Sequence, residues 1–231
     1  MSEEEDYHDE LIKYTGNYGG LNQDSKLWDD LEEFGKNILL KLKIIKIKIY
    51  SGTYQGKKAI VGVEFTYRNL LSDETFLKEH KGTEQFDDIK EFDIKRDEYL
   101  TDFHIRFPDD AEYISQLGFN ANKGNKILVG TEEGEDKYTK LNGKDNIIIG
   151  TFGAIDKKLD SFGVIYANRK ELVIRRYFSL VMLHYLVKKD KKFKKETQKN
   201  YDKIPKEFRY VWKTANLRDD LFFNIVKYIM Y

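Results

Sequence analysis

Residues 42–50 read LKIIKIKIY, and apolar side chains alternate with lysines along most of this stretch. Leu42 and Ile44 share one face of an extended chain, and the alternation resumes with the opposite phase at Ile45. A period of two predicts a β-strand with one buried and one solvated face. The doubled Ile44-Ile45 exchanges the two faces, so it predicts a β-bulge inside this strand.

The same period recurs further along the chain. Half-buried strands are expected at residues 61–67 and 103–107, where apolar and polar side chains alternate. Clusters of Gly, Asn and Asp, which supply the positive φ angles of tight connections, separate shorter apolar runs. These runs lie at residues 114–119, 126–129, 146–152 and 162–166. Together they predict a mainly β, antiparallel fold of several sheets, with no helix before residue 168.

The composition is that of a globular protein. The chain has 231 residues, of which 40% are hydrophobic and 14% aromatic, so a substantial core is expected. Forty basic residues balance 40 acidic ones, so net charge gives no reason to expect a specific nucleic-acid partner. The sequence contains no cysteine, which excludes disulfide bonds, thiol catalysis and cysteine metal sites.

The N-terminal residues do not have the pattern of a secretory signal. Residues 3–10 hold six acids where a signal would have lysine or arginine before an apolar stretch. An intracellular location, cytoplasmic or organellar, is therefore expected. The longest apolar stretch, residues 177–187, is shorter than the roughly 20 residues of a membrane span, so no transmembrane span is expected.

The pattern changes after Asn168. Apolar residues recur at helical spacing between Leu172 and Val187, which predicts a helix. Residues 188–199 then contain seven lysines against two acids, typical of either a solvated helix end or a site for an anionic partner. The sequence thus divides into an acidic arm at 1–13, a β domain at 14–167 and a basic helical extension at 168–231.

No motif for catalysis, metal or cofactor binding stands out. The histidines are scattered, and none has a second ligand at a metal-site spacing. No nucleophile elbow, Walker A loop or dinucleotide-binding glycine motif is present. Adjacent acids, as in Asp109-Asp110, are usual in solvated turns. A non-enzymatic protein that needs no cofactor is expected.

Four segments carry a resemblance to a known family. They are Gly19-Gly20 with Trp28-Asp29-Asp30, Asp97 to Thr101, Leu117 to Gly124, and Ile147 to Gly153 with Leu159 to Val164. In this order and spacing, over residues 14–167, they resemble the motifs of the jacalin-related lectins. The resemblance implies a β-prism of three four-stranded antiparallel sheets around one core, here followed by a C-terminal α-helical extension.

The resemblance also implies a carbohydrate site at one end of the prism. In this family a glycine-rich first loop and the last inter-strand loop hold the sugar through backbone N–H groups and one carboxylate. The matching positions are Gly20 in the first loop and Lys158, Leu159 and Asp160 in the last. An ionised carboxylate accepts strong hydrogen bonds from two hydroxyls. The implied ligand is a glycan of the mannose/glucose or galactose type.

Departures from the family pattern leave two hypotheses open. The mannose-binding pattern Gly-Asp-x-x-Asp is replaced by residues 156–160, DKKLD, in which Lys157 puts a donor where the family has an acceptor. Asp160 could instead cap a turn. The chain is then either a carbohydrate-binding lectin or a prism without sugar binding, serving as a structural subunit or adaptor that docks on partner proteins through residues 168–231.

Overall fold

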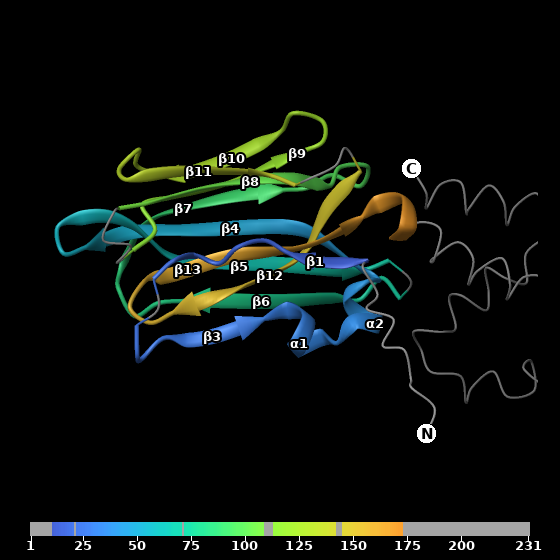
Figure 1. The fold of residues 1–231 in the computed structure, drawn as a ribbon, viewed down its shortest axis with the longest axis horizontal. Coiled ribbons are helices and arrows are strands. Elements are labelled where there is room, and N and C mark those ends of the chain that lie inside the picture. The colour runs from blue at the N-terminus through green and yellow to red at the C-terminus, as the bar shows by residue number, and fades with distance from the viewer. Residues whose placement is uncertain (1–10, 21, 71, 109–112, 142–144, 173–231) are drawn as a thin grey trace, which may run out of the picture.

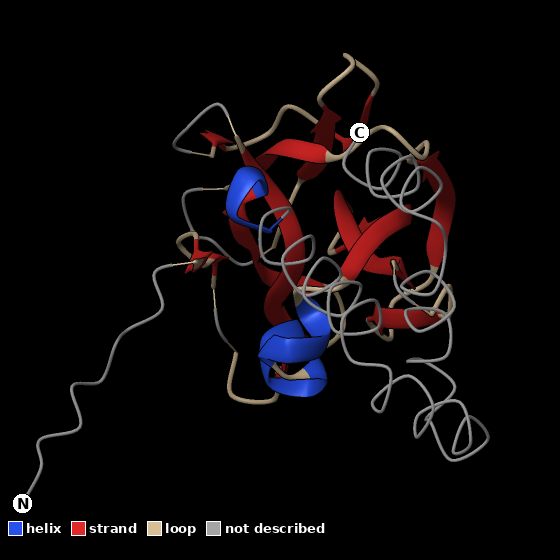
Figure 2. Ribbon diagram, turned by 90° about the vertical axis from the view of Figure 1, so that its right-hand side faces the viewer, coloured by secondary structure: helices blue, strands red, loops and turns tan. Residues whose placement is uncertain are grey.

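A computed structural model describes residues 11–20, 22–70, 72–108, 113–141 and 145–172. Thirteen strands in these residues form three antiparallel sheets, which run along the long axis of the molecule (Figure 1). Viewed along that axis, the strands surround a central core (Figure 2). The expected helix at 172–187 and the lysine-rich stretch at 188–199 lie outside the described residues, apart from Leu172.

The first sheet brings together the two ends of the β domain. Its order is β1-β13-β12-β3, formed by Ile12–Tyr14, Leu159–Asn168, Asn146–Ile155 and Lys26–Asp29. A fifth short strand, β2 (Tyr18–Gly19), pairs with β13 next to β1. Since β1 and β2 pair with different stretches of β13, this five-stranded sheet is still four strands wide.

The other two sheets have four strands each, as expected. The second sheet has the order β6-β5-β4-β7, formed by Thr75–Lys81, Lys57–Asn69, Leu42–Tyr54 and Phe86–Asp93. The third has the order β10-β9-β8-β11, formed by Lys126–Gly130, Gln116–Ala121, Leu100–Phe107 and Glu135–Lys140.

The inner faces of the three sheets share one hydrophobic core. The ring of Phe162 from β13 lies 6.2 Å from that of Phe65 in β5 and 6.1 and 5.9 Å from those of Phe103 and Phe119 in the third sheet. All four side chains are buried, and each stabilises the fold by roughly 1.5–3 kcal/mol. The predicted mainly β prism is confirmed.

The strand at 42–50 contains the predicted bulge. In the pairing of β4 with β5, Ile44 is opposite Tyr67 and Lys46 is opposite Thr66, so Ile45 is the extra residue. Ile44 and Ile47 are both buried on the core side despite their odd spacing. The bulge therefore keeps apolar side chains in the core on both sides of the phase change.

The expectation of no helix before residue 168 is wrong. Two short helices, α1 (Asp30–Phe34) and α2 (Lys36–Leu39), follow β3. The Asp29 carboxylate caps α1 by accepting hydrogen bonds from the backbone N–H groups of Leu31 at 2.7 Å and Glu32 at 3.2 Å. Elements of one turn are too short to show a helical period, and here the cap and the burial of Leu39 stabilise them.

A helix also begins after β13. Residues 169–172 are helical, and the Asn168 side-chain oxygen accepts hydrogen bonds from the N–H groups of Lys170 at 3.0 Å and Glu171 at 3.3 Å. Leu172 is buried in the core cluster. Within the described residues, no helix is long and apolar enough to cross a membrane.

Candidate functional site

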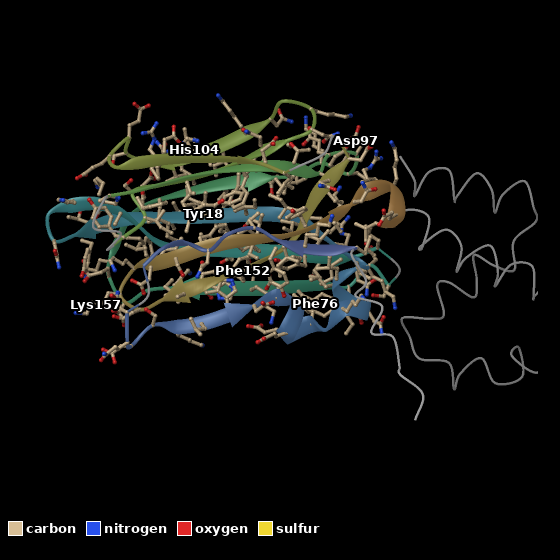
Figure 3. The ribbon with its side chains drawn as sticks, in the orientation of Figure 1. Tyr18, Phe76, Asp97, His104, Phe152 and Lys157 are labelled. Carbon is tan, nitrogen blue, oxygen red and sulfur yellow. The ribbon has the colours of Figure 1, made fainter. Side chains whose placement is uncertain are left out.

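The first and last loops meet at the end of the prism where β13 begins, marked by Lys157 in Figure 3. Gly20 donates its backbone N–H to the carbonyl oxygen of Asp160 at 3.1 Å. Lys158 and Leu159 precede Asp160 directly, so all four residues expected at the sugar site lie together. The Leu159 side chain points into the core and is fully buried.

The Asp160 carboxylate is held by three donors from the protein. Its Oδ1 accepts hydrogen bonds from the Lys158 ammonium at 2.6 Å and the Asn22 amide at 2.9 Å, and its Oδ2 accepts one from the Ser25 hydroxyl at 2.8 Å. A carboxylate offers about four lone-pair positions, so most of its acceptor capacity is in use. Only 1% of Asp160 is exposed to solvent.

Lys158 forms a buried ion pair with this carboxylate. Its side chain is 2% exposed, and its Nζ lies 4.6 Å from the centroid of the Tyr54 ring. A charge at such a position needs a partner, because its transfer out of water costs several kcal/mol. The sequence predicted a role for the Lys158 backbone only, and the structure adds this contact of its side chain.

A close approach of the first loop to the last requires glycine at residue 19. Gly19 has φ +107°, and a Cβ there would lie 2.2 Å from the carbonyl oxygen of Asp160. Such a distance excludes any side chain, so the sterically required glycine is Gly19, while Gly20 supplies the hydrogen bond.

The connection between β6 and β7 is a third loop at this end that the sequence did not reveal. The N–H groups of Thr83 and Glu84 donate to the carbonyls of Asp156 at 3.2 Å and Lys157 at 2.9 Å. A Cβ on Gly82 would lie 2.0 Å from the Lys157 carbonyl oxygen. In the sequence, the one sign of this contact is Gly82, a glycine among charged residues. Its partners in the last loop follow some 70 residues later.

Trp28 and Asp30 of the Trp-Asp-Asp motif belong to the interior of the prism and not to this site, while Asp29 caps α1. The Trp28 indole N–H donates to the Thr151 hydroxyl at 3.3 Å, and that hydroxyl donates to the Asp30 carboxylate at 2.9 Å. The same carboxylate oxygen accepts the Thr151 backbone N–H at 2.7 Å and the Tyr67 hydroxyl. Burial raises the pKa of Asp30 to about 6.

Glu98, in the Glu-Tyr-Leu-Thr segment, also has a structural role. It is 2% exposed, accepts the backbone N–H of Lys95 at 3.2 Å, and accepts a hydrogen bond from the Asn125 amide. These bonds join two turns close to Asp97, at the end of the prism opposite Lys157 (Figure 3). Many of the residues that carry the family pattern in this sequence therefore stabilise the prism.

The histidines of the described strands have structural surroundings as well. His80 stacks on Trp28 with ring centroids 4.2 Å apart, and burial lowers its pKa to about 4. His104 lies on the outer face of the third sheet, with Nε2 3.2 Å from the Asp136 carboxylate. Within the described part of the chain, no group of three or more metal-ligating side chains comes together.

A prism of three antiparallel sheets, with its first and last loops meeting at one carboxylate, defines the class of β-prism lectins. The chain belongs to the jacalin-like lectin domain family, whose sequence model matches residues 15–165. This is a family of lectins, which bind sugars and are not catalysts.

Individual relatives agree with this assignment. Jacalin-related lectin 44 of Arabidopsis thaliana is 28% identical over 145 residues, which is 62% of this chain and 22% of that protein. Two similar structures are a mannose-binding jacalin-related lectin from Ananas comosus and the Calsepa lectin in complex with a biantennary N-glycan. They are 19% and 17% identical, each with a TM-score of 0.54 over 68% of this chain and 98% or 97% of theirs. At this identity they show the shared fold.

Proposed function

We propose that this chain binds carbohydrate at the end of the prism, with the Asp160 carboxylate as the main acceptor. The observation that carries the proposal is the meeting of the first and last loops at this carboxylate, which already accepts a hydroxyl, that of Ser25, at 2.8 Å. A sugar hydroxyl has the same hydrogen-bonding chemistry as Ser25. Charge-assisted hydrogen bonds of this kind are the stronger ones, so two of them can orient a ring.

Mannose-containing glycans are the first ligands to test. Lectins of the same fold include one described as mannose-binding and one solved with an N-glycan. Because the candidate contacts are two hydrogen bonds to one carboxylate, millimolar affinity is expected for a monosaccharide, near 4 kcal/mol.

A second candidate function is that of an interaction module without sugar binding. The 1% exposure of Asp160 favours it, because the carboxylate here joins the first loop to the last through hydrogen bonds from Asn22 and Ser25. In that case residues 168–231 would dock the prism on partner proteins of a larger assembly. Deleting residues 173–231 should then release the protein from its native complex, and unchanged co-purification would contradict the idea.

Binding measurements with matched variants distinguish the two functions. The full chain is titrated calorimetrically with mannose, glucose, galactose and an N-glycan, alongside Asp160→Asn and Asp156→Asn. Asp156→Asn is the control, because it changes an acid of the same loop whose side chain forms no hydrogen bond with Asp160. The proposal expects binding that Asp160→Asn abolishes and Asp156→Asn preserves.

The stability of the Asp160 variant needs its own check. Asp160→Asn leaves the Lys158 ammonium without its charged partner, so a double variant with Lys158→Met is measured in parallel. Thermal unfolding confirms that each variant is folded during the titration. Absence of binding by the wild-type chain to all four ligands would refute the carbohydrate proposal and favour the interaction module.

A further inference from the structure

Residues 22–25 form a turn that lies over Asp160. The turn is closed by two hydrogen bonds of 3.1 Å, from the Ser25 N–H to the Asn22 carbonyl and from the Asn22 N–H to the Ser25 hydroxyl. From this turn the Asn22 amide reaches Oδ1 of Asp160 and the Ser25 hydroxyl reaches Oδ2. Both carboxylate oxygens are thus engaged by one small element.

The turn has little other attachment. Asn22, Gln23 and Asp24 are exposed, and Ser25 is half-buried. Among the residues that the structure describes, the Gln23 and Asp24 side chains form no hydrogen bond or ion pair. A polar, exposed turn without buried apolar side chains opens at small cost, because few contacts are lost.

We propose that this turn is a lid that acts as an internal ligand of Asp160. In the absence of sugar it closes on the carboxylate, and a sugar binds by displacing Asn22 and Ser25. The inference rests on the proposed carbohydrate function. The exchange conserves hydrogen bonds on Asp160, because two sugar hydroxyls replace one amide and one hydroxyl while the displaced side chains bond to water.

The two donors define the chemistry of the ligand. They reach different oxygens of one carboxylate, so a replacing ligand presents two hydroxyls that reach both oxygens together. The ligand class is therefore a sugar with two free hydroxyls on one edge of its ring. Lys158 is not part of the lid: it lies two residues before Asp160, and its ammonium stays on Oδ1 when the turn opens. It is a positioning residue that holds the carboxylate in both states.

Only molecules with an open lid can bind sugar. The apparent affinity is therefore the affinity of the open form multiplied by the fraction of molecules that are open. Even at the net strength of an ordinary hydrogen bond, the two bonds to the carboxylate correspond to a reduction of at least roughly 10- to 30-fold. Variants that cannot make these bonds should therefore bind sugar more tightly than the wild-type chain. This is opposite to the effect expected of residues that contact the sugar.

The test compares the full chain with Asn22→Ala, Ser25→Ala, the double variant and Gln23→Ala. Each is titrated with methyl α-mannoside, methyl α-glucoside and methyl α-galactoside. We expect the single changes to tighten binding by roughly 3- to 10-fold and the double change by roughly 10- to 30-fold. Gln23→Ala alters the same turn without touching Asp160 and should bind like the wild-type chain.

Three other outcomes would overturn the lid. If the wild-type chain binds and the double variant binds equally, the turn does not compete with sugar, and the carbohydrate function stands. If the double variant binds more weakly, Asn22 and Ser25 contact the sugar directly. If no chain binds any of the three sugars, the proposed carbohydrate function fails together with the lid.

Discussion

The ion pair of Lys158 with Asp160 is buried on both sides, with exposures of 2% and 1%. Removing one partner leaves the other charge uncompensated, so Asp160→Ala should lower the free energy of unfolding by roughly 3–5 kcal/mol. The double variant with Lys158→Met has no lone buried charge and should recover much of that loss. Urea denaturation measures both, and equal losses in the single and double variants would show that the unpaired Lys158 charge is not the cause of the destabilisation.

Asp30 and His80 give opposite pH dependences. The pKa of Asp30 is raised to about 6, so between pH 4 and 6 the unfolded chain releases this proton first, and stability falls as pH rises. The pKa of His80 is lowered to about 4, so between pH 4 and 6.5 the unfolded chain holds a proton that the folded chain lacks, and stability rises with pH. The two contributions partly cancel in the wild-type chain.

Variants should uncover each contribution separately. Asp30→Asn removes the contribution to stability that falls as pH rises. The free energy of unfolding should therefore rise between pH 4.5 and 6.5 by on the order of 2 kcal/mol more than in the wild-type chain. His80→Phe keeps an aromatic ring against Trp28 and should show a decrease instead. Urea titrations at the two pH values measure these differences. An Asp30→Asn chain with the wild-type difference would rule out Asp30 as the titrating group.

Resemblance to the family predicted the residues of the candidate site better than it predicted their contacts. Gly20 and Asp160 follow from motif order, and they do lie together. The partners of Asp160 do not follow, because Asn22 and Ser25 lie 138 and 135 residues away in the sequence. Such pairings depend on the folded path of two loops, which no local pattern encodes.

At the level of elements, hydrophobic period predicted seven strands that supply most of the core, namely β4, β5, β8, β9, β10, β12 and β13. It located the bulge in β4 because apolar side chains lie on both sides of it. It missed the short strands β1, β2 and β3, and β11. It also missed β6 and β7, which are edge strands with mostly exposed, charged side chains. Charged side chains on edge strands prevent unwanted pairing with other strands. The same charged residues remove the alternation of apolar and polar side chains by which a strand is recognised in a sequence.

Close packing within the first sheet predicts a clear difference between two glycines. A Cβ on Gly153 in β12 would lie 2.3 Å from the Ser161 carbonyl oxygen and 2.6 Å from the Trp28 ring, so Gly153→Ala should destabilise by about 1–3 kcal/mol. A Cβ on Gly16 would meet its nearest neighbour, the Tyr18 ring, at 3.4 Å, so Gly16→Ala should change little. Thermal unfolding compares the two, and equal effects would contradict this packing.

For the molecule as a whole, the candidate site and the exits of the chain lie at opposite ends. β13 runs from Leu159 beside the site to Asn168, a distance of about 30 Å for ten extended residues. Ile12 pairs with Ala167, so the chain enters the prism close to where it leaves. A partner that docks where residues 168–172 leave β13 would lie at the end opposite Asp160, so the two candidate functions are compatible in one protein.

The position of Leu172 predicts how far the stable unit extends. A chain ending at residue 172 keeps this buried side chain and the Asn168 cap, and should melt close to the full chain and bind sugar equally. A chain ending at 167, where the strand pattern ends, lacks both and should lose roughly 2–3 kcal/mol of unfolding free energy. Urea denaturation of the three chains measures this. Equal stability of the two shortened chains would place the boundary at 167, whereas a large loss in both would mean that residues 173–231 stabilise the prism.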